Sequence, residues 1–374
     1  MSERKRVLFT GYAPVHFVCF LPVYQSLLDD PSVELWLSGG FKRELDEDRV
    51  EFELDGFYDS FPVDRQRVIP IERARQESFD VLVCAHLSDS LFPGAAARTV
   101  QIFHGVSFKN LLVRERALRF DVLCLPGRYH AELYQRQGLI RPDGPRCFLT
   151  GYAKTDPLAR RESDRAVLRA LELDPSRPTI LFAPTGEKRN ALEIHGVEAI
   201  LAIKKTRRFN LLIKPHDHPK RKIDWFSELT SLEDDRTRLV RALDVVPFLD
   251  AADLLITDAS SVAFEYTLVD RPIVFLDVPR MLEKVQKRAP SLDLETYGRK
   301  IGVVVPGPDE LVAAIDDSLA HPEREGPIRR RAAEHIFYRP GGATRRVAGM
   351  VRWAAGLADP PADAEPVAPT SSTP

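Results

Sequence analysis

The sequence has few cysteines, and their arrangement argues against a disulfide framework or a cysteine-based metal site. Four occur among 374 residues, all of them in apolar runs, and none forms a C-x-x-C pair. This pattern indicates buried, reduced thiols. The four residues are Cys19, Cys84, Cys124 and Cys147.

Long apolar stretches are also missing. No run approaches the roughly 18 apolar residues that a membrane-spanning helix needs. Residues 1–6 are polar and lead directly into the strand-like run 7–10, without the apolar region of a signal peptide. We therefore expect a cytoplasmic protein. The basic stretches Arg114–Arg119 and Lys204–Arg208 leave peripheral contact with the inner membrane face open, although the simpler interpretation is a solvated helix face for each.

Neither sign of charge dominates. Lys and Arg number 53 and Asp and Glu number 55, so the net charge is 53 − 55 = −2. That balance gives no global electrostatic reason to expect nucleic-acid binding. With 44% hydrophobic and 29% charged residues, the composition is that of a globular protein, and the length suits two domains.

Short apolar runs alternate with longer helical patterns along the chain, which is typical of βαβ units and parallel sheets. The sequence therefore predicts an α/β protein with two doubly wound sheets in tandem. The first series of strands is expected at Arg6–Thr10, Val33–Leu37, Val81–Ala85, Thr99–Phe103, Asp121–Leu125 and Arg146–Thr150. The second series is expected at Thr179–Phe182, Asn210–Ile213, Leu239–Ala242, Leu254–Thr257, Ile273–Leu276 and Val303–Val305.

The domain boundaries follow from this order of elements. We expect one Rossmann-like domain over residues 1–157 and a second over 158–342. A last helix over 343–356 should pack toward the N-terminal domain. Residues 357–374 are rich in Pro, Ala, Ser and Thr, and such a composition predicts a disordered tail.

Polar residues just past a strand are the candidates for chemistry, because ligands of open parallel sheets bind beyond the carboxyl ends of the strands. The strand Leu254–Thr257 is followed by Asp258, Ser260 and Ser261, which open a helix. Amides and hydroxyls at such a position suit a phosphate, but Asp and Ser are also ordinary capping residues. Taken alone, this segment leaves both interpretations open.

Two further segments of the second half carry cations. Lys214 and His216 flank Pro215 at the end of a strand, where both could meet a diphosphate. The loop after Thr179–Phe182 presents Thr185 together with neighbouring basic residues. A solvated loop explains that second segment equally well.

The first half offers one candidate for acid–base chemistry. His104 ends the strand Thr99–Phe103 and is followed by Gly105. Imidazole is the side chain best able to accept a proton near neutral pH, so a general base is one interpretation. A hydrogen-bonded loop histidine is the other.

Together and in this order, the segments resemble the CDP-glycerol glycerophosphotransferase family, the teichoic-acid primases and polymerases with a GT-B fold. The matching pieces are Q-x-x-H-G at 101–105, G-Y-x-K-x-D at 151–156, I-L-F-A-P-T at 180–185, K-P-H at 214–216, D-L-L-I-T-D-x-S-S-V-A-F-E-Y at 253–266, R-P-I at 271–273 and G-A-T-R-R at 342–346.

The resemblance implies two Rossmann-like domains that face each other across a cleft, with the active site between them. It implies transfer of glycerol phosphate, or a related polyol phosphate, from a CDP-activated donor to a hydroxyl of a glycan, lipid-linked or polymer acceptor. Such a reaction serves teichoic-acid-like or capsule biosynthesis. CDP-glycerol would be the donor substrate, and no cofactor and no metal are implied.

The same resemblance assigns roles to residues. Ser260 and Ser261 would bind the diphosphate, Lys214 and His216 would neutralise charge as CMP departs, and His104 would take the proton of the acceptor hydroxyl. His104 and His216 are thus the predicted catalytic pair. Further donor-side residues are Thr185, Asp258 and Arg346, and acceptor-side residues are His16 and Gly105.

Two other functions stay open at this point. A GT-B glycosyltransferase or epimerase-like enzyme using a UDP-sugar would share the fold and much of the phosphate site. Retaining enzymes of that class carry two acids eight positions apart, whereas Asp258 and Glu265 are seven apart. A non-catalytic nucleotide-binding protein is the third possibility, and the joint presence of His104, Lys214, His216 and the serine pair argues against it.

Overall fold

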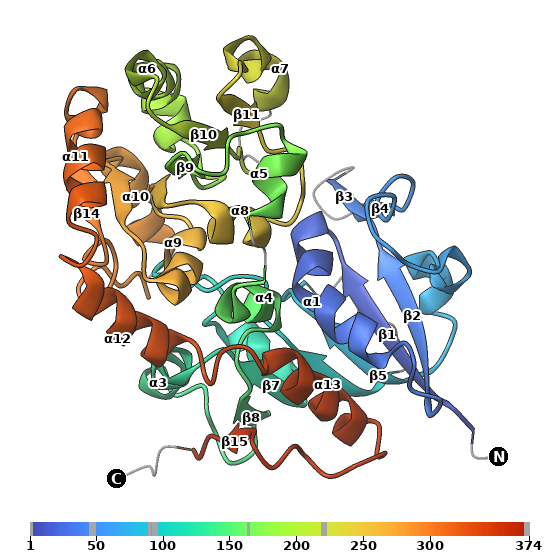
Figure 1. Ribbon diagram of the computed structural model, residues 1–374. Helices are drawn as coiled ribbons and strands as arrows, with labels where there is room; N and C mark the ends of the chain where they lie inside the picture. The colour runs from blue at the N-terminus through green and yellow to red at the C-terminus, as the bar shows by residue number, and fades with distance from the viewer. Residues whose placement is uncertain are drawn as a thin grey trace. The chain divides into compact units, whose positions relative to one another are not determined.

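The computed structural model describes residues 3–44, 50–88, 91, 96–162, 165–217, 223–289 and 291–369. The chain divides into two compact units, which are described separately below (Figure 1). The first unit comprises residues 1–104, 112–156 and 337–374, and the second comprises 105–111 and 157–336. The sequence predicts two domains that are each one continuous stretch, with the boundary at 157/158. The observed units are discontinuous in sequence, because the chain passes between them four times.

The first unit is built on a seven-stranded sheet with the order β15-β8-β7-β6-β5-β1-β2. Apart from β15, all neighbouring strands are parallel. In chain order the parallel strands run 2-1-3-4-5-6, a doubly wound arrangement whose switch point lies between β1 and β5. The strands are β1 (Lys5–Gly11), β2 (Val33–Gly39), β5 (Phe79–Cys84), β6 (Ala96–Gln101), β7 (Val122–Leu125), β8 (Arg146–Leu149) and β15 (Glu365–Pro366).

Helices pack on this sheet. The longest, α1, begins with Pro at its first turn, where a missing N–H costs nothing, and contacts both β1 and α13. The helix α13 also contacts β5, β6 and β7, so it belongs to the first unit (Figure 1). A hairpin of β3 (Phe41–Glu44) and β4 (Val50–Glu53) stands apart from the main sheet. The helices are α1 (Pro14–Leu27), α2 (Ile71–Ala74), α3 (Arg128–Arg136) and α13 (Ala343–Ala354), with 3₁₀ turns η1 (Arg65–Arg67), η3 (Glu115–Arg119) and η4 (Ala153–Thr155).

The C-terminal segment is structured where its composition predicts disorder. Glu365 pairs with Leu149 in an antiparallel bridge, so β15 adds to the edge strand β8. Arg128 donates to the Glu365 carboxylate at 2.8 Å. The free N–H and C=O groups at a sheet edge can form hydrogen bonds with the backbone of a polar segment that has no hydrophobic core of its own. Amino-acid composition contains no information about such pairing. The prediction of disorder therefore fails for residues 357–369, and 370–374 lie outside the described residues.

The second unit contains a six-stranded parallel sheet with the order β11-β10-β9-β12-β13-β14. In chain order this is 3-2-1-4-5-6, the Rossmann arrangement, with its switch point between β9 and β12. Every residue of β9, β10, β12 and β13 is buried, as the continuous apolar runs predict for strands covered on both faces. The strands are β9 (Thr179–Phe182), β10 (Asn210–Ile213), β11 (Thr237–Leu239), β12 (Leu254–Thr257), β13 (Ile273–Leu276) and β14 (Val303–Val305).

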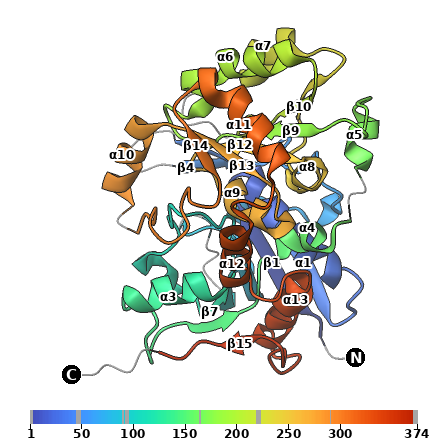
Figure 2. The ribbon, with the colours of Figure 1, turned by 60° about the vertical axis from the view of Figure 1, so that its left-hand side comes forward.

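The helices of the second unit cover this sheet. Figure 2 shows α11 beside the strands, and it contacts α6, β13 and β14. Among the described residues, no helix combines the length and apolarity needed to cross a membrane. The helices are α4 (Asp156–Arg160), α5 (Ala166–Ala170), α6 (Ala191–Thr206), α7 (Trp225–Leu229), α8 (Val246–Ala251), α9 (Val262–Tyr266), α10 (Pro279–Arg288), α11 (Pro308–Ala320) and α12 (Gly326–Ile336), with 3₁₀ turns η5 (Thr230–Leu232) and η6 (Thr267–Val269).

Candidate functional site

Three histidines gather at the switch point of the first unit's sheet. His16 lies in the first turn of α1 after β1, His86 follows β5, and His104 follows β6. These three strands are neighbours, so their carboxyl ends deliver the side chains to one place. The ring of His16 lies 4.6 Å from that of His104 and 5.4 Å from that of His86. The topology thus assembles an imidazole cluster from segments up to 88 residues apart.

His104 is held with one defined nitrogen available to accept a proton. Its Nδ1 is hydrogen-bonded to the carbonyl oxygen of Ala85. A carbonyl can only accept, so Nδ1 carries the proton and Nε2 of the neutral ring carries the lone pair. Burial lowers the pKa of His104, and the nearby charge of Lys154 lowers it further, against the opposing effect of the Ala85 carbonyl. The ring is therefore neutral near pH 7 and suited to act as a base.

The other two histidines each accept a backbone hydrogen bond at Nδ1. Nδ1 of His86 accepts from the amide of Ser88 at 3.1 Å, and its Nε2 lies 3.3 Å from the hydroxyl of Thr10. Burial lowers the pKa of His86 to about 3, so this ring stays uncharged. Nδ1 of His16 accepts from the amide of Tyr12 at 3.2 Å. These contacts group His16 with His104 and add His86, and the acceptor-side role of His16 stays a prediction.

In the second unit, the serine pair follows β12 at the switch point of that sheet. Ser260 is buried and Ser261 is half-buried at the start of α9. Ser261 occupies the N-cap position, yet its hydroxyl makes no cap hydrogen bond. The interpretation as an ordinary side-chain cap is therefore not supported for Ser261, because its hydroxyl is not engaged in that way.

Asp258 precedes this pair in the chain, and its side chain is hydrogen-bonded to the segment that follows β9. Its carboxylate oxygens accept from the amides of Thr185 and Ala191, each at 2.9 Å. The side chain has no exposed surface, and burial raises its pKa against the effect of these amides. Both oxygens are thus engaged with the protein's own backbone. The contact of Asp258 with a phosphate stays a prediction, and the contacts present are those with the backbone of the 185–191 segment.

Lys214 and His216 differ in their surroundings. Lys214 is buried, and its ammonium donates to the carboxylate of Asp217 at 2.6 Å and to the carbonyl of Pro215 at 3.2 Å. Its charge is therefore largely neutralised by a local ion pair. His216 is exposed just beyond the end of β10. Of these two side chains, His216 is the one exposed at this edge of the sheet.

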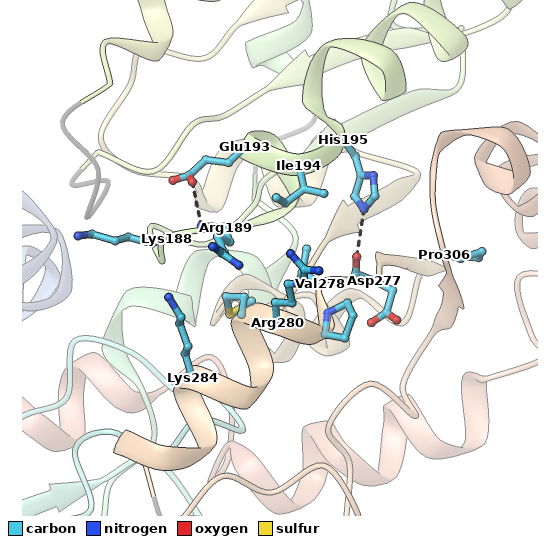
Figure 3. Close-up of a pocket in the computed structure, with 12 residues that line it drawn as sticks. Lys188, Arg189, Glu193, Ile194, His195, Asp277, Val278, Arg280, Lys284 and Pro306 are labelled. Atoms are coloured by element: carbon cyan, nitrogen blue, oxygen red, sulfur yellow. Dashed lines mark hydrogen bonds between the residues drawn. The ribbon is translucent and has the colours of Figure 1, made fainter.

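A pocket of about 710 Å³ opens at the same edge of the second unit (Figure 3). It lies past the carboxyl ends of β9, β13 and β14, between the first turns of α6 and α10. In Figure 3 the amino groups of Lys188 and Lys284 lie toward one end, and His195 lies at the other with Nε2 3.1 Å from the carbonyl of Asp277. The lining carries an excess of cations: Lys188, Arg189, Arg280 and Lys284, against Glu193 and Asp277. Its size and charge suit a nucleotide.

Within the first unit, the G-Y-x-K-x-D segment contacts the start of α13, the helix that carries Arg346. Gly151 has φ +86°, and a Cβ there would lie 2.6 Å from the carbonyl oxygen of Tyr338, so no other residue fits. The Asp156 carboxylate accepts from the first two amides of α13, at 3.0 and 2.7 Å. Arg346 is buried and donates from Nε to the carbonyl of Thr150 at 2.7 Å.

The remaining guanidinium nitrogens of Arg346 are engaged as well. Nη2 donates to the carbonyls of Tyr338 and Arg339, and Nη1 lies 3.3 Å from the Asp363 carboxylate. All three guanidinium nitrogens are thus bonded inside the first unit. They connect the C-terminal segment at Asp363 to the residues before α13 and to the end of β8. The donor-side role expected of Arg346 has no support in these contacts.

Some cations of the two basic stretches bond to other groups of the protein. The Arg119 guanidinium donates to the carbonyl of Leu87 at 2.6 Å. Three cations of the second stretch pair with aspartates, in the pairs Lys204–Asp234, Arg207–Asp235 and Arg208–Asp316. Membrane contact stays a prediction for both. Among the described residues, no three His, Cys, Asp or Glu side chains are grouped to hold a metal ion.

Sequence reasoning missed three polar residues of these sites. His86 follows a strand that was predicted correctly, so the same strand-end rule could have found it. Lys154 lies in a quoted motif, but its electrostatic effect on His104 depends on tertiary proximity. Lys109 carries no sequence signal, although it is buried against Thr185 in the second unit.

Two doubly wound sheets, each with polar residues at its switch point, are the sheets of a GT-B-like fold. The computed structure is similar to a solved structure of the wall teichoic acid polymerase TagF, with a TM-score of 0.67 at 15% identity over 94% of this chain and 89% of that one. A TagF variant with CDPG gives 0.68 at 16% identity, over 94% and 89%. The S. aureus MnaA–UDP structure gives 0.59 at 16% identity, over 95% and 98%. The predicted fold class is confirmed.

The family model described as CDP-Glycerol:Poly(glycerophosphate) glycerophosphotransferase matches residues 95–352. The chain belongs to this family, as the quoted motifs predicted. Two curated relatives are teichoic acid glycerol-phosphate primases. That of Bacillus subtilis (strain 168) is 26% identical over 187 residues, which are 50% of this chain and 43% of the relative. That of Bacillus spizizenii is 25% identical over 244 residues, 62% of this chain and 58% of the relative, so the chain spans about half the length of these relatives.

Proposed function

We propose that this protein transfers glycerol phosphate from CDP-glycerol to a hydroxyl group of a glycan, lipid-linked or polymer acceptor, in the synthesis of a teichoic-acid-like surface polymer. Membership of the glycerophosphotransferase family over residues 95–352 supports the reaction class. The observation that carries the proposal is the state of His104, whose Nδ1 is fixed on the Ala85 carbonyl while Nε2 keeps its lone pair.

The reaction follows from this base. Nε2 of His104 takes the proton of the acceptor hydroxyl, and the oxygen attacks the β-phosphorus of the donor. The bond between the β-phosphorus and the bridging oxygen breaks, CMP leaves with that oxygen, and a new phosphodiester forms. General-base catalysis of this kind contributes roughly 10²–10⁴-fold in rate. Developing charge on CMP requires fixed cations and hydrogen-bond donors.

We assign donor binding to the second unit. The nucleoside occupies the pocket beside α6 and α10, where cations exceed anions. The diphosphate lies over the end of β12, where Ser260 and Ser261 donate hydroxyl hydrogen bonds and exposed His216 meets the departing phosphate. Asp258 holds the loop that carries Thr185 in place. The ion pair with Asp217 gives Lys214 a secondary electrostatic role.

A donor screen tests the function directly. The purified protein is incubated with an acceptor polymer and, separately, with CDP-glycerol, CDP-ribitol or a UDP-sugar, and nucleotide release is measured by chromatography. We expect CMP from a CDP-polyol and no UDP from the sugar donor. Release of UDP, with none of CMP, would replace the proposal by the glycosyltransferase alternative.

A further inference from the structure

The carbonyl group that orients His104 belongs to the same peptide group as the backbone nitrogen of His86. Nδ1 of His104 is hydrogen-bonded to the carbonyl oxygen of Ala85, the residue before His86. A peptide group is planar, so this carbonyl cannot turn unless the backbone nitrogen of His86 turns with it. Whatever fixes the 85–86 peptide therefore also fixes the direction in which Nε2 of His104 points.

The side chain of His86 is hydrogen-bonded at both ring nitrogens. Its Nδ1 accepts from the amide of Ser88 at 3.1 Å. In the neutral ring the proton therefore lies on Nε2, which donates to the hydroxyl oxygen of Thr10 at 3.3 Å. The residue has no exposed surface. Because Thr10 lies in β1, the ring connects the segment after β5 to the neighbouring strand of the sheet.

The groups around His86 restrict the same segment further. The His86 ring lies 5.2 Å from the ring of Tyr12 and 5.4 Å from that of His16. The next carbonyl along the chain, that of Leu87, accepts from the Arg119 guanidinium at 2.6 Å. Residues 86–88 each take part in a hydrogen bond, so the peptide before them has little freedom to turn.

The protonation state of His86 excludes a second base or a proton relay at this position. Burial, followed by the charges of His104 and Arg119, lowers the pKa of His86 to about 3. The ring is therefore neutral near pH 7, and the Nδ1 lone pair is already occupied by the amide of Ser88. What His86 offers to the site is a fixed ring and not a titrating one.

We infer that His86 is a positioning residue: its ring, bonded to Thr10 and Ser88, holds the Ala85 carbonyl that orients His104 for removal of the acceptor proton. This inference rests on the proposed function, in which His104 is the base. A displacement of about 1 Å in a reacting group can cost about 10²-fold in rate. Loss of both ring bonds should therefore lower kcat by about 5- to 50-fold, while donor binding in the second unit is unaffected.

The pH dependence of kcat/KM gives this role a signature. The bond to the Ala85 carbonyl raises the pKa of His104, against the effects of burial and of Lys154. A loosened bond should lower that pKa, so the acid limb of the profile should move to lower pH. His86 is neutral, so its replacement removes no charge. The other titratable groups that face the two rings are Tyr12, His16, Cys84, Arg119 and Lys154.

Two pairs of variants test the inference. His86→Leu removes both ring bonds, whereas His86→Gln keeps an amide at the place of Nε2 that can still bond to Thr10. Thr10→Val removes the hydroxyl, and Thr10→Ser keeps it. We expect the full loss of kcat in His86→Leu, a smaller loss in Thr10→Val, and partial recovery in His86→Gln and Thr10→Ser. The affinity for CDP-glycerol, measured by calorimetry, should stay within about twofold in all four.

Tyr58→Phe is the matched control. It removes another buried hydrogen bond of the first unit, from the Tyr58 hydroxyl to the carbonyl of Ser38. This control should lower the melting temperature without moving kcat or the acid limb. If the His86 and Thr10 variants lose kcat with an unmoved acid limb, or keep wild-type kcat, the inference is wrong. If His86→Leu does not fold, the comparison of Thr10→Val with Thr10→Ser decides by the same two measurements.

Histidine ¹⁵N NMR tests the positioning without any turnover. The wild type should show His104 as the Nδ1–H tautomer, and Thr10→Val and His86→Leu should show a lower pKa and a mixture of tautomers at this ring. An unchanged His104 signal in these folded variants would overturn the inference. A wild type that transfers no glycerol phosphate would overturn the proposed function, and the NMR result would still show whether His86 orients His104.

Discussion

Replacement of His104 by Gln tests the proposed mechanism most sharply. Gln keeps the polarity and approximate size of the side chain, and its amide can still donate to the Ala85 carbonyl. It cannot accept a proton from an alcohol near neutral pH. The substitution therefore removes the base and leaves the hydrogen bond that positions the side chain.

The size of the effect follows from the geometry. Only one nitrogen of His104 has a lone pair in the neutral ring, and the lowered pKa keeps that nitrogen unprotonated near pH 7. The full general-base contribution is therefore present in the wild type and absent in the variant. We expect turnover to fall by roughly 10²–10⁴-fold, about 3 to 5 kcal/mol in activation free energy.

Turnover is measured as CMP release with CDP-glycerol and acceptor, and donor affinity by calorimetry without acceptor. The variant should lose turnover while donor affinity and the melting temperature stay near those of the wild type, since the base acts only once an acceptor is bound. His321→Gln, at an exposed position of the second unit, is the matched control. Wild-type turnover in His104→Gln would refute the mechanism. A joint loss of turnover, affinity and melting temperature would instead indicate a structural histidine.

Three further predictions follow from the same contacts. Lys154→Met removes a charge that lowers the pKa of His104, so the pKa should rise and the acid limb of the kcat/KM profile should move to higher pH; an unmoved limb would contradict the coupling. Changing Ser260 and Ser261 together to Ala should weaken CDP-glycerol binding by about tenfold or more at an unchanged melting temperature, and unaltered affinity in calorimetry would remove the pair from the donor site. Asp156→Asn weakens the two bonds to the start of α13, and chemical denaturation should show a loss of about 1 to 3 kcal/mol, whereas no loss would mean that water replaces the carboxylate.

Much of the fold was accessible from the sequence because strands buried on both faces are continuous apolar runs. β9, β10, β12, β13 and β14 were predicted with their observed bounds. β11 was predicted at Leu239–Ala242 and lies at Thr237–Leu239, because pairing with β10, and not hydropathy, sets its ends. The hairpin β3–β4 and the edge strand β15 were missed, since half-exposed strands leave only a weak periodic signal.

The candidate site was only partly accessible. Strand-end position alone led to His104, Ser260 and Ser261, because a parallel sheet gathers its carboxyl ends at one edge. The same rule did not predict that Lys214 forms an ion pair with Asp217. Nor did it predict that the carboxylate of Asp258 accepts hydrogen bonds from backbone amides. Which partner a charged group finds depends on the approach of loops, and a linear pattern does not contain that information.

The sequence by itself determined the local elements, the order of the strands along the chain and the family, all of which are properties of short stretches of residues. Tertiary structure alone decided which strands are neighbours, and hence that His16, His86 and His104 meet at one switch point. It also decided that Lys109 belongs with Thr185, 76 residues away. The physical reason is that hydropathy and turn chemistry act over a few residues. The contacts of residues 105–111 with the rest of the second unit form only when the whole chain has folded.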